Sequence, residues 1–186
     1  MISGVVLAAG TSSRFGATKQ IVLVHGKPLV AHAVDSLRAG AVDEVLVVVG
    51  HDEEAVRGVL PRDVGVVTNP AYRDGQATSL AAALHAVSVS SEAAVILLAD
   101  QPGITGADVA ALIEGFRQTR SQIVRLAFAD GPGPALLSRE IYADAGHLHG
   151  DAGARVLMAS HPEWVHTVPI ERPAPRDIDT REDLPG

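Results

Sequence analysis

The sequence predicts one α/β domain, spanning residues 1–186, built on a mostly parallel β-sheet. Two observations lead to this fold class. The chain has 186 residues, 47% of them hydrophobic and only 3% aromatic, so one sizeable core must be built mainly from Val, Ala, Leu and Ile. Apolar runs also alternate with helical patterns, which is the order that produces parallel sheets with right-handed crossovers.

Five unbroken apolar runs are the predicted strands. The first begins at the N-terminus and is centred on Val5 to Leu7, and the second is the β-branched run from Val45 to Val49, followed by Gly50. Three more lie at 64–67, 93–98 and 123–128. Strands that are apolar at successive positions are expected in a sheet covered by helices on both faces.

Helical patterns fill the segments between these runs, at 28–40, 52–60, 77–88 and 105–119. Beyond residue 130 the pattern changes, and Gly131 to Pro134 is predicted to be a turn cluster because Gly and Pro dominate turns. Short helices are expected near 138–146 and 152–160, and a late strand at 164–170. The tail 177–184 is predicted to hold a short helix capped by Asp179 or Thr180.

Composition and charge exclude several classes of function. The chain has no cysteine, which excludes disulfides, thiolate metal sites and cysteine nucleophiles. Its formal net charge is −7, whereas non-specific nucleic-acid binding depends on clustered Lys and Arg, so no nucleic-acid partner is expected. No apolar run reaches the roughly 18 residues of a membrane span, and the N-terminus lacks a basic region and cleavage site. We therefore expect a cytoplasmic protein without a membrane partner.

The loop after the first strand is the most unusual segment. It runs from Leu7 to Lys19, and its many small residues would let backbone amides approach phosphate oxygens closely. Arg14 and Lys19 provide cations about where a triphosphate would lie. A Walker A loop does not fit, because five residues separate Gly10 from Gly16. The dinucleotide-binding fingerprint fails on glycine spacing as well.

Asp100, Gln101 and Pro102 follow the predicted strand at 93–98. A carboxylate at the end of a buried strand is costly unless it is paired, hydrogen-bonded or bound to metal. Mg²⁺ prefers a few carboxylates together with substrate phosphates and water. Asp100 is therefore the first candidate metal ligand, and the alternative is a residue that caps the turn before Pro102.

The loop from Asn69 to Leu80 is the third unusual strand end. Gly75, Thr78 and Ser79 offer amides and hydroxyls beside a predicted helix N-terminus, which suits an anion or the polar edge of a base. A plain loop with capping residues is the alternative. Further along, Asp151 is either a helix N-cap or a second Mg²⁺ ligand.

Taken together, these segments resemble the nucleotidyltransferase family that matures molybdenum cofactor, over essentially the whole chain from Ser3 to Leu184. The first loop carries the family's pattern Leu-Ala-Ala-Gly-x-Ser-x-Arg-x-Gly-x-x-Lys. The other matches are Gly26 to Leu29, Asn69-Pro70, Gly75 with Ser79-Leu80, Asp100 to Pro102, Gly133 to Leu137, Gly150 to Arg155 and Asp177 to Leu184. Ala9 and Gln101 stand where the guanylyl branch typically has Gly and Met, so the chain is more similar to the cytidylyl branch.

The resemblance implies a Rossmann-like, three-layer nucleotidyltransferase fold of the glycosyltransferase A type. It also implies Mg²⁺-dependent transfer of CMP from CTP to the phosphate of a molybdopterin-type cofactor, with release of pyrophosphate and hand-over to a xanthine dehydrogenase-type molybdoenzyme. The implied catalytic residues are Arg14, Lys19 and Asp100, and the implied metal ligands are Asp100 and Asp151. The implied nucleotide-binding residues are Leu7, Ala8, Ala9, Gly10, Arg14, Lys19, Asn69, Gly75, Ser79, Gln101 and Pro102.

Three alternatives stay open. The first is a nucleotidylyltransferase for another phosphorylated acceptor, such as a sugar or alcohol phosphate, or one that uses GTP. The second is a nicotinamide-dependent oxidoreductase, which the failed fingerprint disfavours. The third is a non-catalytic cofactor-binding chaperone, which the presence of Arg14, Lys19 and Asp100 disfavours.

Overall fold

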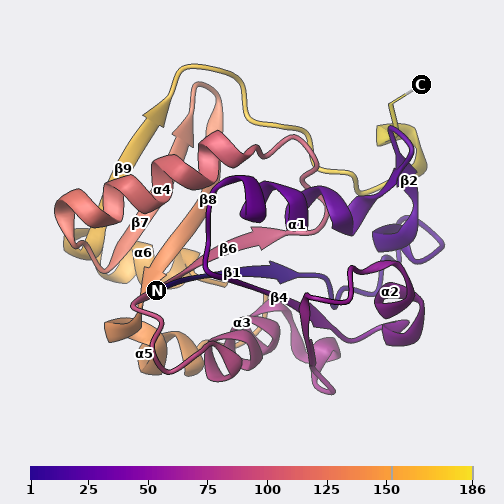
Figure 1. Cartoon of the computed structure of the whole chain (residues 1–186), viewed down its shortest axis with the longest axis horizontal. Helices are drawn as coiled ribbons and strands as arrows, with labels where there is room; N and C mark the ends of the chain where they lie inside the picture. Colours follow the sequence, from indigo (N-terminus) through magenta and orange to yellow (C-terminus); the bar gives the residue numbers. More distant parts are fainter. Residues whose placement is uncertain (152, 186) are drawn as a thin grey trace.

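A seven-stranded sheet lies between two layers of helices in the computed structural model, which describes residues 1–151 and 153–185 (Figure 1). The strands follow the spatial order β5-β4-β1-β6-β8-β7-β9, and only β8 among them runs antiparallel to its neighbours. This arrangement confirms the predicted α/β class with a mostly parallel sheet. The strands are β1 (Ile2–Leu7), β4 (Glu44–Val49), β5 (Gly65–Thr68), β6 (Ala93–Leu98), β7 (Ile123–Phe128), β8 (Gly131–Ser138) and β9 (Val165–Ile170).

Helices cover both faces of the sheet, as its apolar strands require. Successive side chains of a strand point to opposite faces, so Val6 packs in the core beneath α1, α2 and α4 while Val5 packs in the core beneath α3, α5 and α6. Figure 1 shows α1 and α4 on one side of the sheet and α3 and α5 on the other. The helices are α1 (Leu29–Ala39), α2 (Glu53–Val59), α3 (Gln76–Ala86), α4 (Gly106–Thr119), α5 (Tyr142–Gly146) and α6 (Arg155–Ser160). Of the helix predicted at 152–160, residue 152 lies outside the described residues.

The predicted turn cluster at Gly131 to Pro134 is wrong. The turn is made by Ala129 and Asp130, and β8 begins at Gly131, which pairs with Phe128. Pro132 and Pro134 are tolerated because β6 pairs with β8 only between Ala135 and Ser138. A proline lacks the amide that a central strand needs, so it is accepted only where one side of the strand is free. The short hairpin of β2 (Leu23–Val24) and β3 (Lys27–Pro28) was not predicted either.

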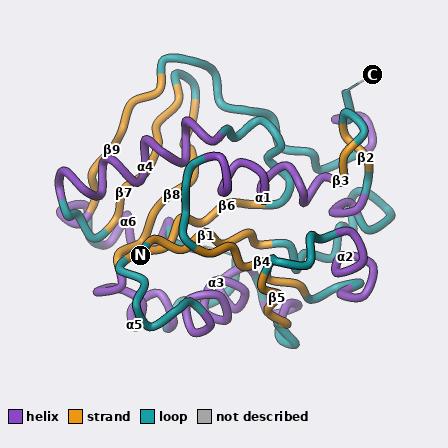
Figure 2. Tube along the Cα trace, viewed as in Figure 1, coloured by secondary structure: helices purple, strands orange, loops and turns teal. Residues whose placement is uncertain are grey.

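The C-terminal tail returns across the molecule after β9. Figure 2 shows it running from the far edge of the sheet to the region beside β2 and β3. There Ile178 is buried against Phe15, Val24 and Leu29. The tail closes in a 3₁₀ turn at Arg181–Asp183, and the hydroxyl and amide of Thr180 both donate to the Asp183 carboxylate. Of the two predicted caps, Thr180 is therefore the one that forms. None of the helices within the described ranges combines the length and apolar character needed to cross a bilayer.

Candidate active site

A cleft of about 570 Å³ opens at the carboxyl ends of the central strands. β1 lies between β4 and β6, so the chain leaves β1 toward one side and later returns to its other side. Open α/β sheets bind ligands at such a reversal. The cleft is lined by Leu7, Ala9, Gly10, Thr11, Ser12, Ser13, Arg14, Lys19, Gln20, Leu29, Tyr72, Arg73, Gly75, Gln76, Ser79, Leu98, Ala99, Asp100, Asp151, Arg155 and Asp179.

The loop after β1 folds back on itself and forms one wall of this cleft. The carbonyl oxygen of Ser12 accepts hydrogen bonds from the amides of Phe15 and Gly16, and both Ser12 and Gly16 have positive φ angles. The buried side chain of Gln20 donates to the carbonyl of Gly10 at 3.0 Å. Phe15 is only 4% exposed, so its buried side chain holds the loop against the protein. The small residues of this loop therefore form a turn that is held in place from inside the protein.

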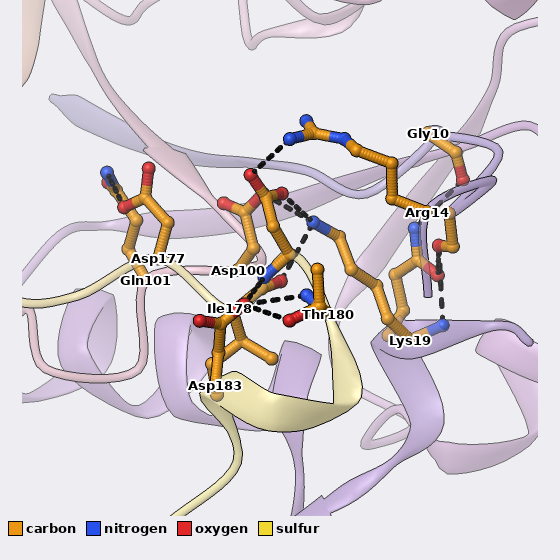
Figure 3. Close-up of polar contacts among 12 residues, drawn as sticks. Gly10, Arg14, Lys19, Asp100, Gln101, Asp177, Ile178, Thr180 and Asp183 are labelled. Atoms are coloured by element: carbon orange, nitrogen blue, oxygen red, sulfur yellow. Dashed lines mark hydrogen bonds and ion pairs between the residues drawn. The ribbon is translucent and has the colours of Figure 1, made fainter. Parts of the chain in front are cut away.

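Two cations and two carboxylates meet at the mouth of the loop (Figure 3). The Lys19 ammonium group donates to Oδ2 of Asp100 at 2.8 Å, to Oδ1 of Asp179 at 3.0 Å and to the carbonyl of Ile178 at 3.0 Å. The other oxygen of Asp179 lies 3.0 Å from a guanidinium nitrogen of Arg14. The structure thus brings together the three residues predicted to be catalytic, Arg14, Lys19 and Asp100, and adds Asp179 from the tail.

Lys19 is held in its charged form. Burial by itself would lower the pKa of its ammonium group, but hydrogen bonds and attraction from Asp100 and Asp179 outweigh burial and raise the pKa above its ordinary value. The Lys19 side chain is only 13% exposed, whereas that of Arg14 is 74% exposed. Lys19 is therefore an enclosed positive charge in the cleft, and Arg14 is an exposed one at its edge.

Asp100 has the chemistry of a metal ligand. Its Oδ1 atom is buried and has no hydrogen-bond partner among the described residues, although Oδ2 binds Lys19. An unpaired buried carboxylate oxygen is costly unless a ligand satisfies it. Within the described ranges no group of three or more His, Asp or Glu side chains is positioned to hold a metal ion. A divalent ion here would therefore need substrate oxygens as well, which is the usual mode for Mg²⁺.

The opposite wall is the N-terminus of α3, and the segment at Gly150 and Asp151 caps it. The amide of Gln76 donates to Oδ1 of Asp151 at 3.2 Å, and the amide of Ala77 donates to the carbonyl of Gly150 at 3.0 Å. Asp151 is thus a cap for α3 that also faces the cleft. Its role as a metal ligand stays a prediction.

The remaining predicted nucleotide-binding residues lie at different depths. Asn69 is buried behind the cleft wall, where its amide donates to the hydroxyls of Thr78 and Ser79 at 2.9 and 3.0 Å. It positions Ser79, which does line the cleft. Gln101 donates to Asp177 at 2.9 Å and faces a neighbouring cavity. Ala8 and Pro102 are not among the residues that line the cleft.

Sequence reasoning missed Asp179 and Gln20 as parts of the site. For Asp179 the sequence predicts only a helix-capping role. The pattern Asp177-Ile178-Asp179 carried a signal, because one buried apolar residue between two acids in an extended chain directs both acids to the opposite side. Burial, together with repulsion from Asp100 and Asp179, raises the pKa of Asp177 despite its hydrogen bond from Gln101. Asp177 lines the neighbouring cavity and adds negative charge close to Asp100 and Asp179.

Comparison with known proteins shows which family and which folds the chain is similar to. A family model described as the MobA-like NTP transferase domain matches residues 4–165. The nicotine blue oxidoreductase of Paenarthrobacter nicotinovorans is 28% identical, covering 98% of this chain and 94% of its own.

Two solved structures share the fold over nearly the whole chain. The manganese complex of Rv0371c from Mycobacterium tuberculosis H37Rv has a TM-score of 0.84 and 28% identity, and the coverage is 98% of this chain and 94% of that one. A nucleotidyl transferase from Methanothermobacter thermautotroptrophicus has a TM-score of 0.84 and 26% identity, with the same two coverages. These likenesses confirm the predicted nucleotidyltransferase fold.

Proposed function

The chain belongs to the MobA-like NTP transferase domain family, and on that premise we propose that it transfers CMP from CTP to the phosphate of a molybdopterin-type cofactor, with Mg²⁺ as its metal ion. One observation carries the proposal. In a cleft at the carboxyl ends of β1 and β6, two cations stand beside a carboxylate with a buried oxygen that has no hydrogen-bond partner in the described part of the chain. That combination suits a metal-bound triphosphate, because the cations and the metal ion together neutralise its charge.

The reaction needs no activated side chain as nucleophile. A phosphate monoester has a second pKa near 6, so the acceptor phosphate is largely a dianion at neutral pH. One of its oxygens forms a bond to the α-phosphorus of CTP, and the bond between that phosphorus and the α–β bridging oxygen breaks. Pyrophosphate leaves with the electron pair. Lys19 and Arg14 stabilise the charge that develops on this leaving group, and the loop after β1 holds the nucleotide in line.

Asp100 is the residue proposed to hold Mg²⁺ through its free oxygen, with substrate phosphates completing the coordination. When bound there, the ion supplies charge neutralisation at the phosphates. The proximity of Asp177 and Asp179 makes the surroundings of Asp100 more negative and favours a cation. Asp151 lines the same cleft and is the second proposed ligand.

The preference for a pyrimidine is proposed from Ala9. Its methyl group is buried in the cleft wall near Tyr72, where the guanylyl branch typically has glycine. A methyl group at this position reduces the space for the base, and this affects a purine more than the smaller cytosine. Gln101 is the other residue that separates the two branches, but its amide donates to Asp177 at the neighbouring cavity. Ala9 therefore carries the proposed base preference.

An oxidoreductase is the second candidate function. The observation in its favour is the likeness to nicotine blue oxidoreductase over 98% of this chain. A nicotinamide cofactor and a metal-bound triphosphate make different demands. A nicotinamide cofactor needs no metal ion. Asp100 and Lys19 together suit a metal-bound triphosphate. An assay that offers CTP with Mg²⁺ and, in parallel, NADH or NADPH decides between the two functions.

The experiment measures pyrophosphate release with CTP or GTP, Mg²⁺ and a molybdopterin-type acceptor, and NADH or NADPH oxidation in parallel. We expect release with CTP in preference to GTP, by roughly tenfold in kcat/KM, from a steric difference of about one methyl group. Asp100→Asn should lower kcat by about a hundredfold or more, since it removes charge at the metal site. Asp63→Asn, a carboxylate on the exposed surface that pairs with Arg38, is the matched control and should keep full activity.

Two results would count against the proposal. Normal Mg²⁺-dependent turnover in Asp100→Asn would remove the metal assignment. NADH oxidation without any nucleotide-dependent pyrophosphate release would favour the oxidoreductase. A stable product bearing cytidine would lead to the next question, whether the cofactor is handed to a xanthine dehydrogenase-type molybdoenzyme, which we propose as the downstream partner.

A further inference from the structure

A second cavity of about 1020 Å³ adjoins the nucleotide cleft. The two share Leu7, Gln76, Leu98 and Arg155, so they are parts of one continuous depression. The second cavity exists because the sheet opens between β6 and β8. Pairing of these strands stops at Ile96 and Ala135, and Pro132 and Pro134 lie beyond that point.

The walls of this cavity are mostly apolar. Most of the lining residues are apolar, with contributions from β6, β7, β8, α6 and the C-terminal tail, and none of the lining residues carries a hydroxyl group. The polar side chains that reach the cavity are Gln76, Gln101, Arg125, Arg155, Arg176, Asp177 and Asp183. Three of these are arginines. An apolar wall suits a ligand with an apolar or aromatic body, and arginine side chains suit an anionic group on it.

Arg125 is the arginine with the most fixed position. It lies in the middle of β7, opposite Ala135 of β8 and Thr167 of β9, and its side chain is half-buried. Its Nε atom donates to the hydroxyl of Thr167 at 3.1 Å, which orients the guanidinium group. No carboxylate lies within ion-pair distance of Arg125 among residues 1–151 and 153–185, and its two terminal nitrogens have no partner there.

A charged group in a partly desolvated position is stabilised by an opposite charge. A half-buried arginine inside a strand therefore indicates an anionic partner. A guanidinium group that is pinned at Nε and free at its two terminal nitrogens presents a fork, which matches a carboxylate or phosphate in two parallel hydrogen bonds. The cavity in front of it is large enough for an organic molecule.

We propose that the second cavity is the acceptor site and that it selects an organic anion with an apolar or aromatic body, whose anionic group binds Arg125. The inference rests on the proposed function, because it assigns the second substrate of that reaction. Arg125 is thus a specificity residue that contacts the acceptor and not the nucleotide.

The test uses a matched pair of probes, 1-anilinonaphthalene-8-sulfonate and its uncharged counterpart N-phenyl-1-naphthylamine. Both are titrated by fluorescence in the presence of saturating CTP and Mg²⁺, which occupy the neighbouring cleft. We expect wild-type protein to bind the sulfonate and Arg125→Gln to bind it at least tenfold more weakly, since a charge-assisted hydrogen bond is lost. Binding of the uncharged probe should change by less than twofold. Arg117→Gln, which removes an exposed charge from α4, should leave both probes unaffected.

Arg125→Lys separates recognition from folding, because it keeps the charge and loses the fork. It should bind the sulfonate with intermediate affinity and retain the wild-type melting temperature. With a productive acceptor, Arg125→Gln should raise the KM for the acceptor about tenfold and leave the KM for CTP unchanged. Equal binding of the sulfonate by wild-type protein and Arg125→Gln would overturn the inference. Sulfonate binding that depends on Arg125, in a protein that neither binds CTP nor releases pyrophosphate, would sink the proposed function and leave the anion site standing.

Discussion

Arg14 and Lys19 share one carboxylate partner, Asp179, yet they differ in how firmly they are held. Lys19 makes three hydrogen bonds and is almost fully enclosed, whereas Arg14 makes one ion pair and is mostly exposed. Enclosure strengthens electrostatic interactions because water screens them less. An exposed ion pair contributes little to stability, so a phosphate can take over the guanidinium of Arg14 at small cost.

Removal of Lys19 should therefore affect catalysis more than removal of Arg14. We expect Lys19→Ala to lower kcat/KM with CTP by about 10²–10³-fold, the range found when a preorganised charge donor is lost. Arg14→Ala should lower it by about tenfold, and Arg14→Lys should recover part of that loss, since an ammonium keeps the charge without the fork. Steady-state pyrophosphate release measures all three.

The other lysine of the chain supplies the control. Lys27 is exposed and pairs with Asp35 on α1, away from the cleft. Lys27→Ala should keep kcat/KM within about twofold of wild type. Equal kinetics in Lys19→Ala, Arg14→Ala and Lys27→Ala would mean that the loop after β1 does not bind the phosphates.

The N-terminus of α3 depends on close contact between two loops that are distant in the chain. Gly75 has a φ of 108° and ψ of 169°, a region accessible essentially only to glycine. A Cβ atom on Gly75 would come within 2.4 to 2.7 Å of the backbone of Gly150. Two capping hydrogen bonds, from the amides of Gln76 and Ala77, depend on the same contact.

Gly75→Ala should therefore destabilise the protein and weaken nucleotide binding together. The steric clash and the forced backbone conformation should lower the free energy of unfolding by about 2–4 kcal/mol, from overpacking and left-handed strain combined. Urea unfolding and CTP titration measure the two effects. Gly58→Ala is the matched control, because Gly58 lies inside α2 with nothing within 4 Å of a new Cβ. That change should stabilise the protein by up to about 1 kcal/mol through helix propensity. Destabilisation of both variants to the same extent would refute the steric account.

Element by element, the sequence predicted the structure wherever a clear periodic pattern was available. The apolar runs and helical patterns from Val5 to Phe128 correspond to observed strands and helices. β2 and β3 have only two residues each, too few to show any alternation. β8 begins with glycines and prolines that ordinarily form turns, and only its position beside β7, with its other side free of β6, makes them acceptable in a strand.

The site itself is a property of the whole molecule. Sequence patterns located Arg14, Lys19 and Asp100, because each follows the end of a recognisable strand. Asp179 lies 160 residues from Lys19, and its place in the site depends on a tail that crosses the molecule and is anchored by Ile178. A contact at that separation leaves no local pattern. The size and apolar character of the second cavity also follow from where β6 and β8 part, which the sequence alone does not reveal.

Two buried groups should make the fold sensitive to alkali. Burial raises the pKa of Tyr142 to about 12. An unfolded tyrosine ionises near pH ~10, so between pH ~10 and about 12 the unfolded state loses its proton first and the free energy of unfolding falls. Lys19 has a raised pKa in the fold. Its contribution to stability is complete below its unfolded value near ~10.5 and is lost as the pH rises through the folded value.

Urea unfolding at intervals from pH 8 to 11.5 should show this loss and divide it between the two groups. Tyr142→Phe has no phenol to ionise, so its free energy of unfolding should fall less steeply than that of wild type above pH ~10. Lys19→Met has no ammonium to lose, so its decline should also be shallower, although it starts from a lower stability at pH 8 because Asp100 and Asp179 are left facing each other without their cation. Lys27→Met should follow the wild-type curve, since its ion pair is on the surface. Parallel curves for wild type, Tyr142→Phe and Lys19→Met would show that neither group couples its protonation to folding, and the charged state assigned to Lys19 in the cleft would then need another explanation.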